Sequence, residues 1–310
     1  MTPPLTPGQK RFLIVFNPLP NRQRKARLQR LLLRLKQGNH DWQLFPTDEN
    51  YAANKHSFDL HTDKFSDVIV LGGDGTFNLV VNLIQGHNVR VGLIPAGTGN
   101  DFARAWYGKS RNNVSHILNV VLGERAEPVS LGCCAFEDVK QSESGQLKRY
   151  FHNILGTGFD AALAKDLRHN KGWIQSLGYV LAAVKHIPFF KEPNCEIETE
   201  SQTHTYHNLI TVFANSKFFG NGMPVAPDAD PKSSNLQLVR VGKHKAWTKL
   251  ALITQLLLGR HKSSPHVDMK VCNDPTFIKT PGLDLEADGE YIGTSPCQVS
   301  VVENALLLKR

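Results

Sequence analysis

Short apolar strands alternate with amphipathic helices in the first part of this 310-residue chain. The clearest strand signal is Val68–Leu71, a continuous apolar run of the kind that parallel sheets bury on both faces. This alternation is typical of an open parallel sheet with right-handed crossovers, and such sheets bind ligands at the carboxyl ends of their strands. The other elements expected here are strands at Phe12–Phe16, Trp42–Phe45 and Val89–Ile94, and helices at Arg22–Lys36, Phe77–Ile84 and from Phe102 onward.

The pattern changes after about Gly123, where short strand-like segments follow one another between turn residues. Such segments at modest spacing indicate an antiparallel sandwich, here interrupted by helices at Trp173–Ile187 and Ala246–Leu258. We therefore predict an α/β domain over residues 1–125 and a β-sandwich-like domain over residues 126–310, whose last strand can return to the first domain. The strand-like segments are Pro128–Ala135, Arg149–Leu155, Cys195–Glu200, Leu209–Ala214, Leu236–Val241, Val267–Val271 and Leu283–Ala287.

Cysteine content and apolar run lengths limit where the chain can reside. Five cysteines without a Cys-x-x-Cys pair argue against a disulfide framework or a zinc ribbon, and favour a reducing compartment. The apolar run Phe12–Phe16 is too short for the core of a signal peptide. The longest apolar stretch, Leu250–Leu258, contains Thr254 and Gln255 and cannot span a bilayer. We expect a cytoplasmic protein that can attach peripherally to a membrane.

The formal net charge of +8 favours anionic partners. Segment Arg22–Lys36 holds seven basic residues and no acid, while its leucines at 28, 31, 32 and 35 have the spacing of one buried helix face. Two interpretations stay open, a solvated basic helix on a core and a surface that rests on anionic lipid headgroups. No aromatic residues alternate with these charges, so nucleic acid is not expected as a partner.

The strongest local motif is Gly72-Gly73-Asp74-Gly75-Thr76, which lies directly between a predicted buried strand and a helix. Glycines at such a position let the backbone approach a ligand and point its amide hydrogens at phosphate oxygens, helped by the helix amino terminus. A carboxylate there would repel phosphate unless it holds a metal ion or a ribose hydroxyl. Asp74 is therefore either a functional residue or a turn former.

A second glycine-rich turn follows the strand Val89–Ile94, in the segment Pro95-Ala96-Gly97-Thr98-Gly99-Asn100-Asp101. Asn100 or Asp101 is expected to cap the next helix. Two such loops at neighbouring strand ends would form one concave site. Neither loop matches the P-loop pattern or the G-x-G-x-x-G fingerprint, so the site is nucleotide-like but of another class.

Together, Gly72–Thr76 and the segment Pro95-x-Gly97-Thr98-Gly99-Asn100-Asp101-Phe102-Ala103-Arg104 resemble the diacylglycerol kinase catalytic-domain family, which includes bacterial lipid kinases and is related to sphingosine and ceramide kinases. The resemblance implies an NAD-kinase/diacylglycerol-kinase-like fold, with an N-terminal α/β domain, a β-rich sandwich domain and an active site in the cleft between them. Further similar segments are Asn153-x-x-Gly156-x-Gly158-Phe159-Asp160, Asn215 to Ala229, and Asp288-Gly289-Glu290.

By this resemblance the protein transfers the γ-phosphate of ATP, with Mg²⁺, to a lipid hydroxyl such as that of diacylglycerol. Asp74 would also position the nucleotide with its Mg²⁺, and Asp101 and Arg104 would lie at the acceptor. Glu290 matches the family's general base, although spacing alone makes it an exposed hairpin residue because Asp-Gly is a common turn dipeptide. The residues implied to contact ATP are Thr47, Gly72, Gly73, Asp74, Gly75, Thr76, Gly97, Thr98 and Asn100.

The chain departs from the bacterial pattern at a structural Mg²⁺ site, for which the resemblance implies Asp230, Ser233 and Leu236. Lys232 and Ser233 stand where carboxylates are expected. A hard cation needs oxygen ligands and negative charge, so the sequence puts this second metal site in doubt.

Two rival functions remain open. One is a kinase of another small hydroxyl compound such as NAD, and the other is a catalytically weak lipid- or nucleotide-binding protein. The acceptor lipid and the oligomeric state, a homodimer included, are not specified by the sequence.

Lipid access requires an apolar surface, and three groups of residues are candidates. We expect Phe189 and Phe190, beside Lys191, to be exposed. We expect Phe218 with Phe219, and Trp247 with Leu256–Leu258, to belong to the core.

Overall fold

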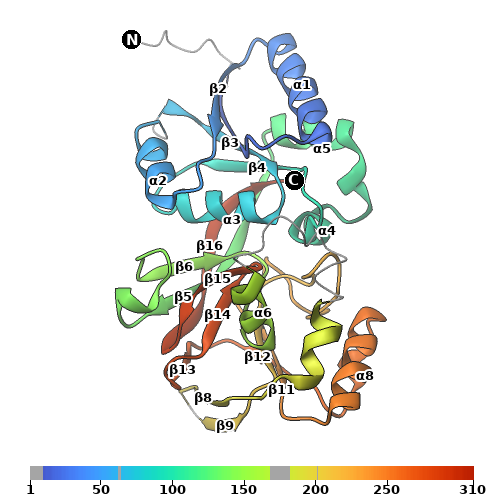
Figure 1. The fold of residues 1–310 in the computed structure, drawn as a ribbon. Helices are drawn as coiled ribbons and strands as arrows, with labels where there is room; N and C mark the ends of the chain where they lie inside the picture. The colour runs from blue at the N-terminus through green and yellow to red at the C-terminus, as the bar shows by residue number, and fades with distance from the viewer. Residues whose placement is uncertain (1–9, 62–63, 168–181, 201) are drawn as a thin grey trace. The chain divides into compact units, whose positions relative to one another are not determined.

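The computed structural model describes residues 10–61, 64–167, 182–200 and 202–310 (Figure 1). The chain divides into two compact units, one of Met1–Val129 with Ala305–Arg310 and one of Ser130–Asn304. The expected fold class, an α/β domain followed by a β-rich domain, is confirmed.

A parallel sheet forms the centre of the first unit, with strand order β2-β1-β3-β4-β16. Residues Leu307 and Leu308, at the end of β16 (Cys297–Lys309), pair in parallel with the start of β4. The four inner residues of β1 and all six of β3 are buried, as their continuous apolar sequences predict. The first four strands are β1 (Arg11–Phe16), β2 (Asp41–Pro46), β3 (Asp67–Gly72) and β4 (Arg90–Pro95).

Helices pack on this sheet in two groups (Figure 1). Arg34 of α1 donates to the side chain of Asn119 in α5, and the Tyr51 hydroxyl at the start of α2 donates to the carbonyl of Asn82 in α3 over 3.3 Å. The leucine face expected in α1 is confirmed, since Leu31 and Leu35 are fully buried. The helices are α1 (Arg22–Gln37), α2 (Tyr51–Asp59), α3 (Asp74–Leu83), α4 (Asp101–Tyr107), the 3₁₀ turn η2 (Gly108–Asn112) and α5 (Val114–Leu122).

The carboxyl-terminal residues are anchored in the first unit by a buried ion pair. Lys309 Nζ lies 2.5 Å from Asp67 Oδ1, and both side chains are fully buried. Burial lowers the pKa of Lys309 to about 8, against the opposing effect of Asp67. The Trp106 indole N–H also donates to the Lys309 carbonyl over 2.9 Å, so the last strand is held from both sides.

In the second unit one antiparallel sheet has the order β12-β11-β10-β7-β14-β15. The other contains β5, β6, β8, β9, β13 and the first part of β16. Side chains from both sheets, including Phe151, Ile197, Phe213 and Leu285, form one buried apolar cluster, which confirms the sandwich. The strands are β5 (Ala126–Phe136), β6 (Lys148–Phe151), β7 (Ile154–Gly158), β8 (Asn194–Glu198), β9 (Thr203–His207), β10 (Ile210–Ala214), β11 (Leu236–Val241), β12 (Asp268–Cys272), β13 (Thr276–Ile278), β14 (Asp284–Ala287) and β15 (Glu290–Thr294).

Two expectations for this unit need correction or completion. The strand predicted at Arg149–Leu155 is two strands, because the backbone N–H groups of residues 152–154 bind a buried carboxylate instead of continuing a ladder. Of the helix predicted at Trp173–Ile187, residues 173–181 lie outside the described residues, while 182–186 are helical and lead into the 3₁₀ turn η5 (Ile187–Phe189). The remaining helical elements are η3 (Val139–Gln141), α6 (Phe159–Leu167), α8 (Ala246–Leu257) and η6 (His261–Ser263).

Within the described ranges, no helix combines the length and the apolar character that crossing a bilayer requires.

Candidate functional site

The two glycine loops of the first unit touch each other through their backbones. A side chain on Gly97 would place its Cβ 2.5 Å from the Gly73 Cα, and one on Gly73 would place its Cβ 2.9 Å from the Gly97 Cα. Real Cβ atoms do not approach backbone this closely, so both positions require glycine. The loops therefore form one continuous strip of partly exposed backbone at the ends of β3 and β4.

The side chain of Asp74 connects the two loops by hydrogen bonds, which a residue that only forms a turn would not do. Its Oδ2 accepts the backbone N–H of Asp101 and its Oδ1 accepts that of Phe102, each over 3.1 Å. These amides are at the amino terminus of α4, where backbone donors lack helical partners and a negative charge is favourable. The carboxylate of one loop thus caps the helix that follows the other.

Asn100 is at the N-cap position of α4, as expected, but it does not form the expected capping hydrogen bond. Asn100 adopts the left-handed conformation (φ 53°, ψ 47°) at the N-cap position, and its side chain makes no capping hydrogen bond to α4. Instead, its Oδ1 accepts the Gly97 N–H over 2.9 Å and its Nδ2 donates to the Gly97 carbonyl over 2.7 Å. Asn100 therefore shapes the second loop and leaves the end of the helix to Asp74.

The other expected residues of the first unit lie at the same edge of the sheet. Thr47 directly follows β2 and donates its N–H to the Phe16 carbonyl over 2.9 Å, and β1 lies between β2 and β3. Thr98 is exposed at the tip of the second loop. Asp101 is buried, with Arg104 Nε 3.9 Å from its Oδ1 on the next helical turn. Because parallel strands present their carboxyl ends together, these residues share one rim.

Glu290 lies in a hairpin of the second unit. Asp288 (φ 51°) and Gly289 (φ 88°) form a two-residue turn with both residues at positive φ, which joins β14 to β15. The Glu290 side chain is 55% exposed, and its Oε2 lies 3.2 Å from a guanidinium nitrogen of the buried Arg149. The exposed hairpin position expected from spacing is thus present, and an arginine holds the carboxylate.

The sequence indicates no role for Asp288 except in the Asp-Gly turn. In the structure its side chain anchors that turn. Its carboxylate accepts the backbone N–H groups of His152 (3.0 Å), Asn153 (2.8 Å) and Ile154 (3.0 Å). His152 Nδ1 also lies 2.6 Å from Asp288 Oδ2, and both side chains are fully buried. The backbone just before Glu290 is therefore fixed to the start of β7.

A pair of buried carboxyl groups lies behind the same turn. A Cβ on Gly156 would lie 2.0 Å from Asp160 Oδ2 and 2.7 Å from Glu286 Oε1, so only glycine leaves room for both oxygens. Those oxygens have no hydrogen-bond partner among the described residues, whereas Glu286 Oε2 accepts the Gly289 N–H over 2.7 Å. Burial raises the pKa of both carboxyl groups, Asp160 to about 7. Burial therefore disfavours the charged form of both carboxyl groups.

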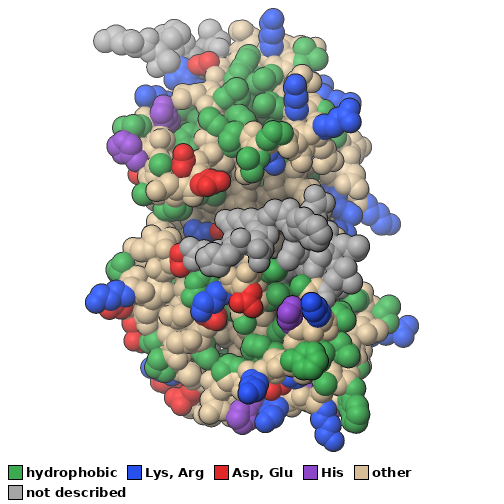
Figure 2. Space-filling model, viewed as in Figure 1, with side chains coloured by type: hydrophobic (Ala, Val, Ile, Leu, Met, Phe, Trp, Pro, Cys, Tyr) green, Lys and Arg blue, Asp and Glu red, His purple; other side chains and the backbone are tan. Residues whose placement is uncertain are grey.

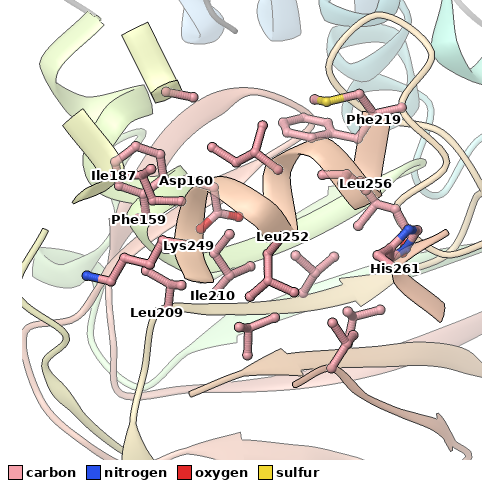
Figure 3. Close-up of a pocket in the computed structure, with 18 of the residues that line it drawn as sticks. Phe159, Asp160, Ile187, Leu209, Ile210, Phe219, Lys249, Leu252, Leu256 and His261 are labelled. Atoms are coloured by element: carbon pink, nitrogen blue, oxygen red, sulfur yellow. The ribbon is translucent and has the colours of Figure 1, made fainter. Parts of the chain in front are cut away.

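An apolar cavity of about 130 Å³ lies beside Asp160 in the second unit (Figure 3). Figure 3 shows Asp160 among the apolar side chains, with Leu252 and Leu256 from α8, while Lys249 and His261 lie toward opposite ends. A cavity with such a lining suits hydrocarbon. Periodicity along the sequence could not reveal it, because its walls come from segments more than 100 residues apart.

The residues implied for a structural Mg²⁺ close a turn instead. Asp230 Oδ1 accepts the Lys232 N–H over 3.0 Å, and the Ser233 hydroxyl donates to the Asp230 carbonyl over 2.8 Å. Leu236 is buried at the start of β11. The described residues contain no group of three or more His, Cys, Asp or Glu side chains placed to hold a metal ion. A single carboxylate beside a lysine does not fit this cation.

The architecture of the two units is one that known proteins share. A parallel α/β unit with two glycine loops at adjacent strand ends, followed by an antiparallel sandwich, defines the class of proteins with an NAD-kinase-like fold. Residues 11–134 match the diacylglycerol kinase catalytic domain, and residues 153–309 match the YegS C-terminal NAD kinase beta sandwich-like domain. The chain therefore belongs to the diacylglycerol kinase family.

Individual relatives agree with this assignment. The chain is 30% identical over 255 residues to "Putative lipid kinase YtlR" of Bacillus subtilis (strain 168), covering 79% of this chain and 81% of that protein. It is 27% identical over 295 residues to the diacylglycerol kinase of the same organism, covering 93% and 92%. The crystal structure of a diacylglycerol kinase from Bacillus anthracis str. Sterne superposes with a TM-score of 0.72 at 18% identity over 96% of both chains, which shows the shared fold.

Proposed function

We propose that this protein is an ATP-dependent lipid kinase, which transfers the γ-phosphate of ATP to a hydroxyl group of diacylglycerol or a similar lipid. It would act from the cytoplasm on lipid at the surface of an anionic membrane. The observation that carries the proposal is the backbone contact between Gly73 and Gly97. That contact creates a strip of backbone at two adjacent strand ends, the kind of surface that binds phosphate groups.

In this proposal the first unit holds the phosphate donor. Backbone amides of the first loop and the amino terminus of α3 face the phosphates, and the donor residues are Thr47, Gly72, Gly73, Asp74, Gly75, Thr76, Gly97, Thr98 and Asn100. Mg²⁺ would enter with the nucleotide and supply positive charge to its phosphates, and the Asp74 carboxylate would position the nucleotide together with this ion. Asp101 and Arg104 act at the acceptor.

The second unit supplies the base and the apolar environment. Glu290 accepts the proton of the acceptor hydroxyl while the hydroxyl oxygen forms a bond to the γ-phosphorus and the bond from that phosphorus to the bridging oxygen of ADP breaks. Arg149 orients the Glu290 carboxylate, and Asp288 fixes the turn before it. The apolar cavity supports a lipid acceptor rather than a polar one such as NAD.

The test is a labelled-ATP assay over a panel of lipids in mixed micelles, with NAD included. We expect transfer to one lipid class, with loss of at least about 10²-fold in Glu290→Gln because the general base is removed. Glu303→Gln is the matched control, an exposed glutamate of the same unit, and should retain wild-type activity.

Three results would contradict parts of the proposal. Transfer that survives in Glu290→Gln would exclude this residue as the base. Phosphorylation of NAD alone would assign the chain to the other kinase class. ATP binding without any transfer would favour a binding protein.

A further inference from the structure

Helix α8 (Ala246–Leu257) has two apolar faces. Leu252, Ile253 and Leu256 on one face line the cavity of the second unit. Trp247 (71% exposed), Leu250 (37%) and Leu257 (48%) project from the other. At about 100° per residue these three fall within an arc of about 80°, whose centre lies roughly 130° around the helix from that of the cavity-lining residues. The core position expected for Trp247, Leu257 and Leu258 is therefore wrong, because only one of the two apolar faces is needed to cover the cavity.

Two neighbouring side chains extend the outer face. Leu258, directly after the helix, is 63% exposed, and Phe189 of η5 is 84% exposed. The η5 segment is fixed beside α8, because Lys249 Nζ donates to the Phe190 carbonyl over 2.7 Å and pairs with Glu192 at 2.6 Å. We call the exposed group Phe189, Trp247, Leu250, Leu257 and Leu258 the α8 surface. Scattered exposed leucines are ordinary, whereas five large exposed apolar side chains on one helix and the turn fixed beside it indicate a contact site.

The charges that flank α8 along the sequence have one sign. The sequence contains no Asp or Glu from 231 to 267, and this stretch holds seven Lys and Arg residues. Lys243 and Lys245 are exposed before the helix, and Arg260 and Lys262 are exposed after it. Figure 2 shows hydrophobic and basic side chains next to one another where Figure 1 draws α8.

Acidic residues near this surface are already paired. Asp228 lies 2.5 Å from Lys262, and Glu192 is paired with the buried Lys249. Within the part of the chain that the structure describes, Lys243, Lys245 and Arg260 form no ion pair, and Lys245 Nζ lies 5.7 Å from the centre of the Trp247 ring. The rim of the α8 surface is therefore positively charged.

We propose that the α8 surface docks onto an anionic lipid bilayer. Trp and Leu side chains enter the boundary between headgroups and acyl chains, and basic residues at both ends of the helix meet the anionic headgroups. A second copy of the chain would bring two positive rims together, which disfavours self-association through this surface. The proposal rests on the proposed function in one respect only, that the bilayer would supply the lipid acceptor to the cavity beneath α8.

Vesicle co-sedimentation without ATP tests the docking directly. Wild-type protein should bind phosphatidylcholine vesicles that contain phosphatidylglycerol at least about tenfold better than vesicles of phosphatidylcholine alone. Trp247→Ser with Leu258→Ser should reduce binding to the anionic vesicles by at least about tenfold. Lys243→Gln with Lys245→Gln should reduce the preference for anionic vesicles. The matched control is Leu19→Ser with Leu60→Ser, two leucines of the first unit that are 65% and 59% exposed.

Several outcomes would overturn the proposal. Vesicle binding that is equal in the wild type and in the Trp247/Leu258 variant would exclude this surface. The same holds if the control variant loses as much binding. It also holds if the wild type elutes as a dimer and the Trp247/Leu258 variant elutes as a monomer. Melting temperatures of the exposed-site variants should match that of the wild type, which excludes unfolding as the cause of lost binding.

The docking and the kinase function can fail separately. A water-soluble short-chain acceptor, assayed without vesicles, should be phosphorylated equally by the wild type and by the Trp247/Leu258 variant. No turnover in the wild type would contradict the kinase function while vesicle binding could still support the docking.

Discussion

Asp74 Oδ1 accepts the backbone N–H of Phe102 over 3.1 Å, so the carboxylate of the first glycine loop caps the helix that follows the second loop. A residue that was open to interpretation as a turn former thus links two loops whose first residues, Gly72 and Pro95, are 23 positions apart. Its role in positioning a nucleotide, which we propose, can be separated from this structural role by substitution.

Replacement of Asp74 by alanine should lower the free energy of unfolding by about 1–2 kcal/mol, because two amides of α4 lose their acceptor. Asp74→Asn keeps one acceptor oxygen and should lose less stability, while losing the charge needed with Mg·ATP. Urea unfolding and an ATP-turnover assay measure the two effects. An alanine variant as stable as the wild type would show that the cap is not needed.

Gly97→Ala should separate the two glycine loops, since its Cβ would lie 2.5 Å from the Gly73 Cα and backbone cannot yield as a side chain can. We expect a loss of about 1–3 kcal/mol in stability and a larger proportional loss of ATP affinity, measured by urea unfolding and calorimetry. Gly242→Ala is the control, because its Cβ would meet only the His207 carbonyl, at an ordinary 3.7 Å. Unchanged ATP affinity in Gly97→Ala would argue against the strip of backbone as the phosphate site.

The Asp160–Glu286 pair should make stability depend on pH. Burial raises the pKa of the Asp160 carboxyl from 3.8 to about 7, so between these values the folded chain binds a proton that the unfolded chain has released. Stability should therefore fall as pH rises from about 4 to about 7, by up to about 1.4 kcal/mol per pH unit for this proton, and the raised pKa of Glu286 extends the fall to higher pH. Urea unfolding across this range measures the slope.

Asp160→Asn is the informative comparison for that slope, because an amide nearly keeps the shape of the carboxyl group and does not titrate. The difference in stability between the variant and the wild type should change across pH 4 to 7 in the variant's favour. Parallel curves for the two proteins would show that Asp160 is not the source of the pH dependence.

Asp288→Ala should be among the most destabilising single changes in the second unit. It would leave three buried backbone N–H groups and His152 without their acceptor, at a cost of roughly 3 kcal/mol or more. Asp288→Asn tolerates the positive φ of 51° and should lose less. Thermal and urea unfolding compare the two variants, and equal losses would show that the turn conformation matters more than the carboxylate.

Much of the fold follows from local patterns, and the site follows in part. The sequence pattern alone predicts the burial of Val68–Leu71 and of the leucines of α1. The glycine loops are recognisable from their sequence motifs. The Asp160–Glu286 pair could not be predicted, because 126 positions separate its members and only the sandwich brings them to Gly156. The strand β9 (Thr203–His207) was missed because its alternation is polar, as in a strand at the edge of a sheet.

Trp247 was wrongly predicted for a related reason. Apolar residues on both sides of a helix give the same sequence signal whether one side or both are buried. Only the position of α8 over the cavity shows which face is covered.

Strand β16 gives the first unit a discontinuous sequence, because its last residues pair with β4 and bring Lys309 to Asp67. No single cut of the gene can therefore yield that unit intact. A fragment that stops near Val129 would expose the edge of β4 and leave Asp67 without its lysine. A circular permutant that fuses residues 305–310 ahead of Lys10 is the rational route to an isolated first unit.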